Sequence, residues 1–412
     1  MKKYIITITL TLVSVINFTS QSQEIKNKEQ KVVLKLISEK LLASYVDIDL
    51  AKEMSTAIKS NSKKYMSISD SKGFSKLLTK DLQKISKDLH LKVNFEPKRI
   101  AQKKRVMPTE MKLKREKMMA MRMGEVNYGF TEVKVLNGNI GYLNLRMFAD
   151  IKYAKEAATA AMHFLSNTNA LIIDLRTNEG GVPSMMQLLA SYFTNEKPVL
   201  LSDFYERKTD TKTQLFTFEH IDGKRRVGKP LYILTSKKTF SAAEAFTYTL
   251  KHYNKAIVVG ETTRGGANRT KRIILNANFS ISVPYIKAIN PITKTNWEGK
   301  GVVPTIKTTK KDAFVIAYIA AIHKTVKRNK SRTLNRIGYT FLQEKSIENA
   351  IKVFQENAKQ FPNDANSWDS LGEAYFMNKD KVNSLKSYKK ALELDPKSKS
   401  AKKRIQLLKK TK

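Results

Sequence analysis

Cysteine is absent from this chain of 412 residues. Its absence excludes disulfides, thiolate metal sites and lipid attachment through an N-terminal cysteine. Long apolar runs are scarce as well: residues 4–18 form the longest, which is shorter than the roughly 20 residues of a membrane-spanning helix. This run follows Lys2 and Lys3 and precedes a short polar stretch, a pattern that predicts a secretory signal peptide over residues 1–22. An uncleaved membrane anchor is the alternative.

Acidic residues are also few: 37 Asp and Glu stand against 76 Lys and Arg, which gives a net charge of +39. Such a surface attracts anionic partners. The lysines are spread along the whole chain without a recognised nucleic-acid-binding motif, so we expect no nucleic acid as a partner. A solvated lysine-rich surface, or contact with acidic components of a cell envelope, fits better. The length and the 41% apolar content predict two or three folded domains.

Two regions precede the central part of the chain. Residues 25–97 carry apolar side chains at helical spacing, among them Val33 and Ile37, which predicts an N-terminal helical domain. Residues 98–125 are rich in lysine, arginine and methionine and are interrupted by Pro108. That composition indicates a basic helical linker rather than part of a core.

Residues 126–312 contain short β-rich runs that alternate with helical stretches. The runs lie at residues 140–143, 171–175, 231–234 and 256–259. Strands that alternate with helices predict an α/β layer with parallel strands. We therefore expect an α/β core that is flanked by all-α regions on both sides.

The C-terminal residues 331–412 repeat with a period of 34 residues, after a helical linker at 313–330. Gly338 pairs with Gly372, and Phe354 pairs with Tyr388. The second copy resembles a tetratricopeptide repeat, whose spacings are matched by Trp368, Leu371, Gly372, Tyr375, Tyr388, Ala391 and Pro396. Two repeats and a final helix are near the minimum for a stable solenoid, so we expect them to dock a partner or a second chain. A structural cap on the preceding domain is the alternative.

Three segments of the core region carry the residue types of a hydrolytic site. In the first, the run 171–175 leads into Gly180 and Gly181. A strand that ends in two glycines before a helix exposes backbone N–H groups that can bind an oxyanion. A tight turn that merely requires glycine is the alternative.

The second segment places Ser241 at the start of a helix, with Glu244 three residues later. This spacing fits a capping box, in which the serine only caps the helix and the glutamate reaches back. A serine here is also well placed as a nucleophile, because the N–H of Ala242 points toward a tetrahedral oxyanion. The two interpretations can be separated only in combination with other segments.

The third segment contains the glycine-rich loop 260–267 and ends in residues 296–304. With it, the chain resembles the C-terminal processing peptidases, in the branch of tricorn protease and interphotoreceptor retinoid-binding protein. The motifs follow the family's order: Asp174-Leu175-Arg176 with Asn178 and Gly180-Gly181, then Ser241-Ala242-Ala243-Glu244, then Gly260-Glu261-Thr262-Thr263, and finally Asn290-Pro291 through Trp297-Glu298-Gly299. The resemblance covers residues 26–307 and implies a crotonase/ClpP-like α/β serine peptidase core with neither cofactor nor metal.

The resemblance implies that Ser241 is the nucleophile and that the backbone N–H groups of Gly180, Gly181 and Ala242 form the oxyanion hole. In the processing-protease branch the base is a lysine downstream of the serine. Its spacing falls on Gly266 in this chain, and the nearest lysine after the glycine loop is Lys271, in what reads as the next strand. A serine–lysine dyad is therefore not expected.

The tricorn-like branch instead takes its base from a histidine that precedes the core. The stretch from Asp88 through His90 to Val93 looks like that histidine motif, so we expect His90 to take the Ser241 proton. The other four histidines lack a comparable motif; they are His163, His220, His252 and His323. A structural or surface histidine is the alternative for His90.

The resemblance points to Glu298 as the group that holds the imidazole in its productive tautomer. In tricorn-like enzymes this glutamate acts through a hydroxyl beside the histidine, whereas the neighbour here is Leu89, so the contact would be direct or through water. A surface carboxylate in a turn is the alternative. Glu244 is a weaker candidate, because the capping box explains it without catalysis.

Together these features predict an exported serine peptidase that acts on polypeptides through an acyl-enzyme on Ser241, with His90 as general base. The stretch between His90 and the core is too short for the PDZ domain of many processing proteases, so the repeats or the basic linker would recruit substrate. A non-catalytic carrier of apolar ligands on the same fold is one alternative. A repeat-based interaction scaffold with an inert core is the other.

Overall fold

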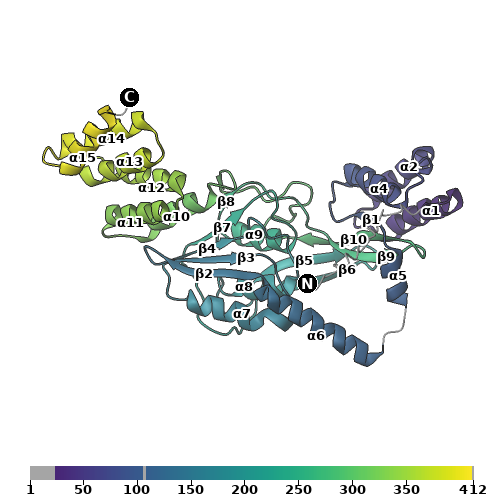
Figure 1. Cartoon of the computed structure of the whole chain (residues 1–412). Coiled ribbons are helices and arrows are strands. Elements are labelled where there is room, and N and C mark those ends of the chain that lie inside the picture. The colour runs from purple at the N-terminus through teal and green to yellow at the C-terminus, as the bar shows by residue number, and fades with distance from the viewer. Residues whose placement is uncertain (1–23, 105–107, 411–412) are drawn as a thin grey trace, which may run out of the picture.

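The computed structural model describes residues 24–104 and 108–410. The chain is elongated, with the N-terminal helices and the C-terminal helices at opposite ends of a central α/β part (Figure 1). The predicted signal peptide, residues 1–22, lies outside the described residues. Within the described ranges, no helix is long and apolar enough to cross a membrane.

A six-stranded sheet forms the centre of the molecule, in the order β11-β8-β7-β4-β3-β2. Its strands are β2 (Phe130–Leu136), β3 (Ile140–Leu145), β4 (Ala170–Asp174), β7 (Leu231–Thr235), β8 (Ile257–Gly260) and β11 (Ile306–Lys307). All neighbours pair in parallel except β2, which is antiparallel to β3. The four β-rich runs of the sequence are β3, β4, β7 and β8, so the prediction of a parallel α/β core is confirmed.

Helices cover both faces of this sheet, which explains why its central strands are apolar throughout. Leu171 and Ile173 of β4 pack with α7 (Ile151–Phe164), α8 (Pro183–Ser191) and α9 (Ala242–His252). Ile172, between them, faces the other side and packs with α10 (Ala313–Thr325). Alternation along β4 thus sends successive side chains into two separate cores.

A second sheet is antiparallel and links the N-terminal region to the core. Its strands are β1 (Lys92–Phe95), β5 (Leu200–Glu206), β6 (Thr211–Phe216), β9 (Arg269–Ile274) and β10 (Phe279–Ile289). β10 lies at its centre and pairs with β1, β5 and β9. The register of β1 on β10 sets Lys92 opposite Ser282 and Phe95 opposite Phe279.

The N-terminal helices share a core with this second sheet. They are α1 (Asn27–Ser44), α2 (Ile48–Ser60), α3 (Ser62–Met66) and α4 (Ser71–Ser86). The predicted helical side chains Val33 and Ile37 are fully buried, and they belong to one cluster with Phe279 and Ile281 of β10. The helical region therefore completes the burial of β10 and is not an independent unit.

The basic segment after β1 is helical. It forms α5 (Pro97–Lys104) and α6 (Thr109–Glu125), and it leads through a short 3-10 turn (Asn127–Gly129) into β2. No residue of α6 is buried. This exposure agrees with the expectation of a solvated basic linker.

The C-terminal helices are α10 (Ala313–Thr325), α11 (Lys330–Gln343), α12 (Ile347–Gln360), α13 (Ala365–Met377), α14 (Lys381–Leu394) and α15 (Lys399–Lys410). The segment expected as a helical linker, 313–330, holds α10, which packs against β4, β7 and β8 and extends the sheet's second core into the repeats. Its apolar composition explains this, because few of its side chains favour water.

The two repeats are helix pairs, α11 with α12 and α13 with α14. A Cβ atom added to Gly338 would lie 2.3 Å from the Phe354 ring, and one on Gly372 would lie 3.0 Å from the Tyr388 ring. Both glycines thus make room for the aromatic side chain of the paired helix, as the repeat pattern implies. The fold class predicted from the sequence is confirmed in all three parts.

Candidate active site

The loops that follow β4 and β7 meet at the carboxyl ends of the parallel strands, where α/β sheets place their sites. Asn178, which is fully buried, joins the two loops. Its Oδ1 accepts the N–H of Gly180 at 2.8 Å, and its backbone oxygen accepts the N–H of Phe240 at 3.1 Å. Its Nδ2 donates to the backbone oxygen of Leu145 at 2.9 Å. Asn178 therefore fixes the glycine turn against the residue that precedes Ser241.

The glycine turn lies directly beside Ser241. A Cβ atom on Gly180 would lie 2.7 Å from Cβ of Ser241 and 2.9 Å from the nitrogen of Ala242. Gly180 also has a φ of +99°, which side chains disfavour. The turn requires glycine for its conformation and also because the two loops approach so closely.

Ser241 occupies the N-cap position of α9 with φ 54° and ψ −120°. An N-cap residue ordinarily has an extended backbone with negative φ, and a non-glycine residue in this region is strained. Glu244 does reach back, because its Oε2 accepts the N–H of Ser241 at 2.9 Å. Capping accounts for Glu244, but it does not account for the strained backbone of Ser241.

Glu244 has a structural role that the capping pattern reveals only in part. Besides Ser241, its carboxylate accepts hydrogen bonds from the hydroxyl of Thr263 and from the N–H groups of Gly265 and Gly266. The side chain is fully buried; burial raises its carboxyl pKa, and these hydrogen bonds oppose that rise. Glu244 thus holds the glycine-rich loop after β8 against the start of α9.

A cavity of about 260 Å³ opens beside Ser241. Ser241, Ala242, Gly181 and His90 all contribute to its lining, although His90 comes from the N-terminal region. Much of the remaining lining is apolar and includes Met186, Leu201, Phe204, Leu215, Ala288 and Trp297. The expected nucleophile and the expected base therefore share one cavity. No hydrogen bond between the Ser241 hydroxyl and His90 is present in the described residues.

The three expected oxyanion donors differ in availability. The N–H of Gly180 is donated to Asn178, so we omit Gly180 from the candidate oxyanion hole. Within the described residues, the N–H groups of Gly181 and Ala242 have no acceptor, and both residues line the cavity. Two donors remain for an oxygen atom above Ser241.

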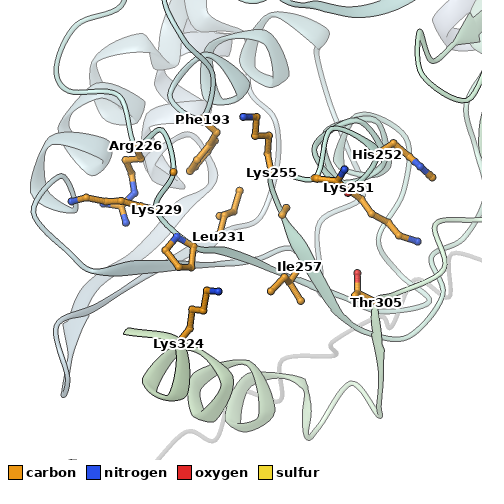
Figure 2. A pocket seen from close by; sticks show the side chains of 14 residues that line it. Phe193, Arg226, Lys229, Leu231, Lys251, His252, Lys255, Ile257, Thr305 and Lys324 are labelled. Carbon is orange, nitrogen blue, oxygen red and sulfur yellow. The ribbon is translucent and has the colours of Figure 1, made fainter. Parts of the chain in front are cut away.

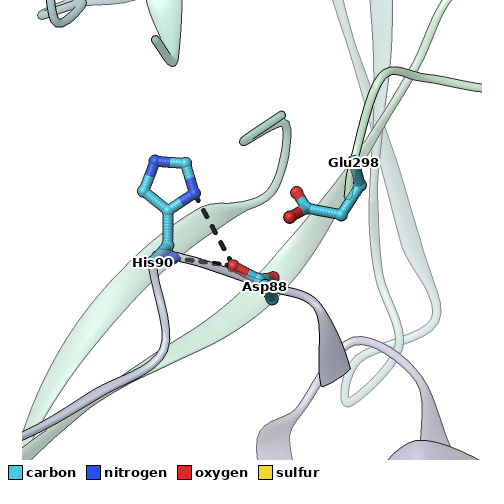
Figure 3. Close-up of side chains that lie close together, drawn as sticks. All are labelled: Asp88, His90 and Glu298. Carbon is cyan, nitrogen blue, oxygen red and sulfur yellow. Dashed lines mark hydrogen bonds and ion pairs between the residues drawn. The ribbon is translucent and has the colours of Figure 1, made fainter. Parts of the chain in front are cut away.

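His90 lies in the turn between α4 and β1, with its ring against Phe240 at a centroid distance of 4.5 Å. Nδ1 is buried without a hydrogen-bond partner and lies 3.7 Å from Oδ1 of Asp88 (Figure 3). Burial, reinforced by the charges of Lys92 and Arg264, lowers the pKa of His90 to about 4. The imidazole is therefore neutral at pH 7 and able to accept a proton.

Two carboxyl groups accompany His90. Oδ2 of Asp88 accepts the side-chain amide of Asn268 at 2.9 Å, and Oε2 of Glu298 accepts the N–H groups of Ala267 and Asn268 at 2.6 and 3.0 Å. Burial raises the pKa of both carboxyl groups, and the charge of Asp88 raises that of Glu298 further. Glu298 thus lies near His90, where the sequence placed it, but without a hydrogen bond to the ring among the described residues.

The same three side chains are the strongest candidates for a metal site in the described part of the chain. One donor atom each from Asp88, His90 and Glu298 lie within 4.8 Å of one another. Among the side-chain donor atoms of these three residues, only Nδ1 of His90 and Oε1 of Glu298 are buried without a hydrogen-bond partner. Two such atoms are fewer than the three protein ligands of a typical catalytic zinc site, so we assign no metal here.

Gly266, at the spacing of the family's lysine, borders the histidine. A Cβ atom at Gly266 would lie 2.7 Å from Cε1 of His90 and 2.2 Å from Cε2 of Phe240. The histidine ring and Phe240 thus occupy the space that a side chain at this position would need. Lys271 lies in β9, 3.8 Å from Glu206 and outside the cavity lining. The remaining four histidines do not line the cavity either.

A larger hollow of about 620 Å³ lies at the other end of the parallel strands, where β7 and β8 begin (Figure 2). Its lining carries no carboxylate and five cations: Arg226, Lys229, Lys251, Lys255 and Lys324. Arg226 and Lys229 donate to carbonyl oxygens just past the end of α7, and Lys251 and Lys324 lie in the last turns of α9 and α10. Cations at helix C-termini compensate the helix dipoles, so the charge has a structural explanation. The smaller cavity beside Ser241 therefore remains the candidate active site.

Three contributors to the site were missed by sequence reasoning. Asn178 was noted only as part of a motif, Asn268 was not noted, and Asp88 was quoted without a role. The spacing of Asp88, two residues before His90, was an available signal, because an aspartate at that distance readily accepts the N–H of the later residue. No comparable signal marks Asn268, because its contact with Asp88 joins distant segments.

Comparison with known proteins gives two matches to one family. Residues 139–308 match the model of peptidase family S41, and residues 22–126 match the N-terminal domain of peptidase S41 in eukaryotic IRBP. These two stretches together make up well over half of the chain. The chain belongs to peptidase family S41, a family of serine-type peptidases. Residues 365–398 match the tetratricopeptide repeat, which confirms the second repeat.

Curated relatives of this S41 chain are processing proteases. It is 27% identical over 188 residues to carboxy-terminal processing protease CtpB of Bacillus subtilis, covering 45% of the chain and 37% of that protein. It is 25% identical over 293 residues to a probable CtpA-like serine protease of Staphylococcus aureus, covering 68% of the chain and 56% of that protein. The chain thus spans about half or less of the length of these relatives.

Among solved structures, the photosystem II D1 C-terminal processing protease superimposes with a TM-score of 0.45 at 15% identity. The superposition covers 69% of this chain and 94% of that one.

We predict that Gly266→Ala displaces His90 or Phe240, because the new Cβ overlaps both rings. Overpacking of this kind costs about 1–3 kcal/mol of unfolding free energy. Denaturant unfolding measures the loss. Gly124→Ala is the matched control, because its Cβ meets only the hydroxyl of Tyr128, at 3.7 Å. Equal stability of the two variants would contradict the assignment of this space to His90.

We predict that Glu298→Gln flattens the pH dependence of stability. Burial raises the pKa of Glu298 from 4.5 to about 8, so the folded state binds this proton more tightly than the unfolded state. The resulting stability is complete below pH 4.5 and is lost as the pH rises to about 8, by roughly 1.4 kcal/mol for each pH unit between these two values. Glutamine does not titrate. Chemical unfolding from pH 4 to 9 should show that the free energy of unfolding of Glu298→Gln increases relative to that of the wild type as the pH rises. If the two free energies change in parallel with pH, the prediction is wrong.

Proposed function

We propose that this chain is an exported serine peptidase that hydrolyses peptide bonds through an acyl-enzyme on Ser241, with His90 as general base. One observation supports this function above the others: the strained Ser241, two free backbone N–H donors and a neutral histidine line the same cavity. Strain of this kind persists where the surrounding structure enforces it, which is common at active sites. A serine that only caps a helix has no use for such a backbone.

Acylation starts when Oγ of Ser241 attacks the carbonyl carbon of the scissile bond and its proton passes to Nε2 of His90. The oxyanion accepts hydrogen bonds from the N–H groups of Gly181 and Ala242. The C–N bond then breaks, and His90 returns the proton to the leaving amine. In deacylation, His90 takes a proton from water, the hydroxide attacks the acyl carbon, and Ser241 leaves with the proton.

The environment of His90 suits both halves of this cycle. Its depressed pKa keeps the imidazole neutral, so one ring nitrogen is free to accept the serine proton. Nε2 lies on the side of the ring away from Asp88 (Figure 3). The carboxyl groups of Asp88 and Glu298 lie close enough to stabilise the imidazolium that forms during attack.

The substrate that fits this proposal is a polypeptide held in an extended or unfolded state. The cavity takes one apolar side chain beside Ser241, because most of its wall is apolar. The tetratricopeptide repeats stand at the far end of the molecule and would recruit a protein partner rather than shape the cleavage site (Figure 1).

We predict that Ser241→Ala and His90→Ala each lower kcat/KM for an unfolded polypeptide or an activated ester by at least about a thousandfold. Ser67→Ala and His220→Ala, which alter exposed residues, are the matched controls and should keep full activity. If hydrolysis is unchanged in both site variants, the peptidase assignment is wrong. Saturable binding of an apolar ligand to this inactive core would then favour the alternative function, a non-catalytic carrier of apolar ligands.

Export is a second part of the proposal and is supported by the pattern of residues 1–22. We predict that protein recovered from outside the cytoplasm lacks this segment and begins near residue 23, as mass spectrometry of the N-terminal peptide can show. Deletion of residues 2–22 should keep the protein in the cytoplasm. Full-length protein that starts at Met1 and fractionates with membranes would instead establish the anchor.

A further inference from the structure

Asp88 is a fully buried carboxylate that takes no part in the proton transfers described above. It lies in the turn between α4 and β1, beyond the end of the helix. Its Oδ1 accepts the backbone N–H of His90 at 2.9 Å, and the same oxygen lies 3.7 Å from Nδ1 of the His90 ring. A buried carboxylate with this geometry requires an explanation, since burial without compensation is costly.

One nitrogen of the His90 ring, Nδ1, can form a hydrogen bond with Asp88. Nδ1 is buried and has no hydrogen-bond partner, and it faces the Asp88 carboxylate (Figure 3). A buried nitrogen without a partner costs free energy, and a shift of under about 1 Å would bring Oδ1 within hydrogen-bond distance. That bond would place the proton on Nδ1 and leave Nε2 as the acceptor.

Glu298 contacts the same assembly from the opposite side. Its Oε2 accepts the N–H groups of Ala267 and Asn268, while the side chain of Asn268 donates to Oδ2 of Asp88. The chain of contacts therefore runs from Glu298 through Asn268 to Asp88, and from Asp88 to His90.

We propose that Asp88 is the positioning residue that orients the His90 imidazole, with Nδ1–H toward Asp88 and Nε2 toward Ser241, and that Glu298 acts one step behind it through Asn268. This inference rests on the proposed function. It differs from the family resemblance, which assigns the orienting role to Glu298.

The acid–base properties of the pair agree with this division of roles. Both oxygens of Asp88 accept hydrogen bonds, one from the backbone N–H of His90 and one from the side-chain amide of Asn268, which suits an ionised carboxylate. Oε1 of Glu298 is buried without a hydrogen-bond partner, and burial raises the pKa of this carboxyl group, so Oε1 is an oxygen that can carry a proton. Asp88 is then the ionised acceptor beside Nδ1, as an orienting carboxylate must be.

The test combines histidine tautomers with kinetics. Protein labelled with ¹⁵N in its five histidines gives a distinct ring signal for each, and His90→Gln identifies that of His90. In the wild type we expect the Nδ1–H tautomer. Asp88→Ala should remove this preference and lower kcat by on the order of a thousandfold with little change in KM. Asp88→Asn, whose amide can donate to Nδ1, should favour the Nε2–H tautomer and lower kcat by a similar factor.

Two further variants keep the test decisive. Asn268→Ala releases Oδ2 of Asp88 without removing the carboxylate, and it should lower kcat less than Asp88→Ala; it also serves if Asp88→Ala fails to fold. Asp81→Ala alters another carboxylate of the N-terminal region, which bonds Lys64 and Tyr65 away from the cavity, and should change neither readout.

The outcomes separate this inference from the proposed function. A wild-type tautomer and wild-type kcat in Asp88→Ala, with Ser241→Ala inactive, would overturn the role of Asp88 and leave the peptidase intact. If Ser241→Ala still hydrolyses substrate, the proposed peptidase mechanism is wrong. The tautomer of His90 in Asp88→Ala would then still show whether Asp88 orients the ring.

Discussion

The antiparallel pairing of β1 with β10 is the interaction on which the candidate site depends. His90 and Ser241 are far apart in the sequence, and β1 begins two residues after His90. Its register on β10, with Lys92 opposite Ser282, fixes where the histidine turn lies. β10 also pairs with β9, whose first residue follows the loop that holds Ala267 and Asn268. One strand thus aligns the histidine with the loop that supports it.

This constraint makes the N-terminal region part of the candidate site as well as part of the core. Its helices bury one face of β10, so the energy that holds His90 in place comes from a core shared with the second sheet. Ser241 is held from the other side by Glu244 and Asn178, which join the loops after β4, β7 and β8. The strain at Ser241 is offset by these buried hydrogen bonds.

The sequence was sufficient to predict the architecture. Periodicity and β-rich runs located the parallel strands, and the 34-residue period located the repeats, because both depend on local pattern. The motifs singled out Ser241 and His90 as one pair. The role of α10 was not predicted, because an apolar helix has the same sequence pattern whether it links domains or covers a sheet. The loss of Gly180 as a donor and the contacts of Asp88 depend on side chains that meet only in the folded chain.

The central claim is that His90 activates Ser241 as a nucleophile. It is tested most directly by treating the folded protein with a fluorophosphonate and mapping the adduct by mass spectrometry, in the wild type and in His90→Ala. The account predicts one adduct, on the peptide that contains Ser241, and its loss in His90→Ala. An adduct on another residue, no adduct in the folded wild type, or undiminished labelling of Ser241 in His90→Ala would contradict it.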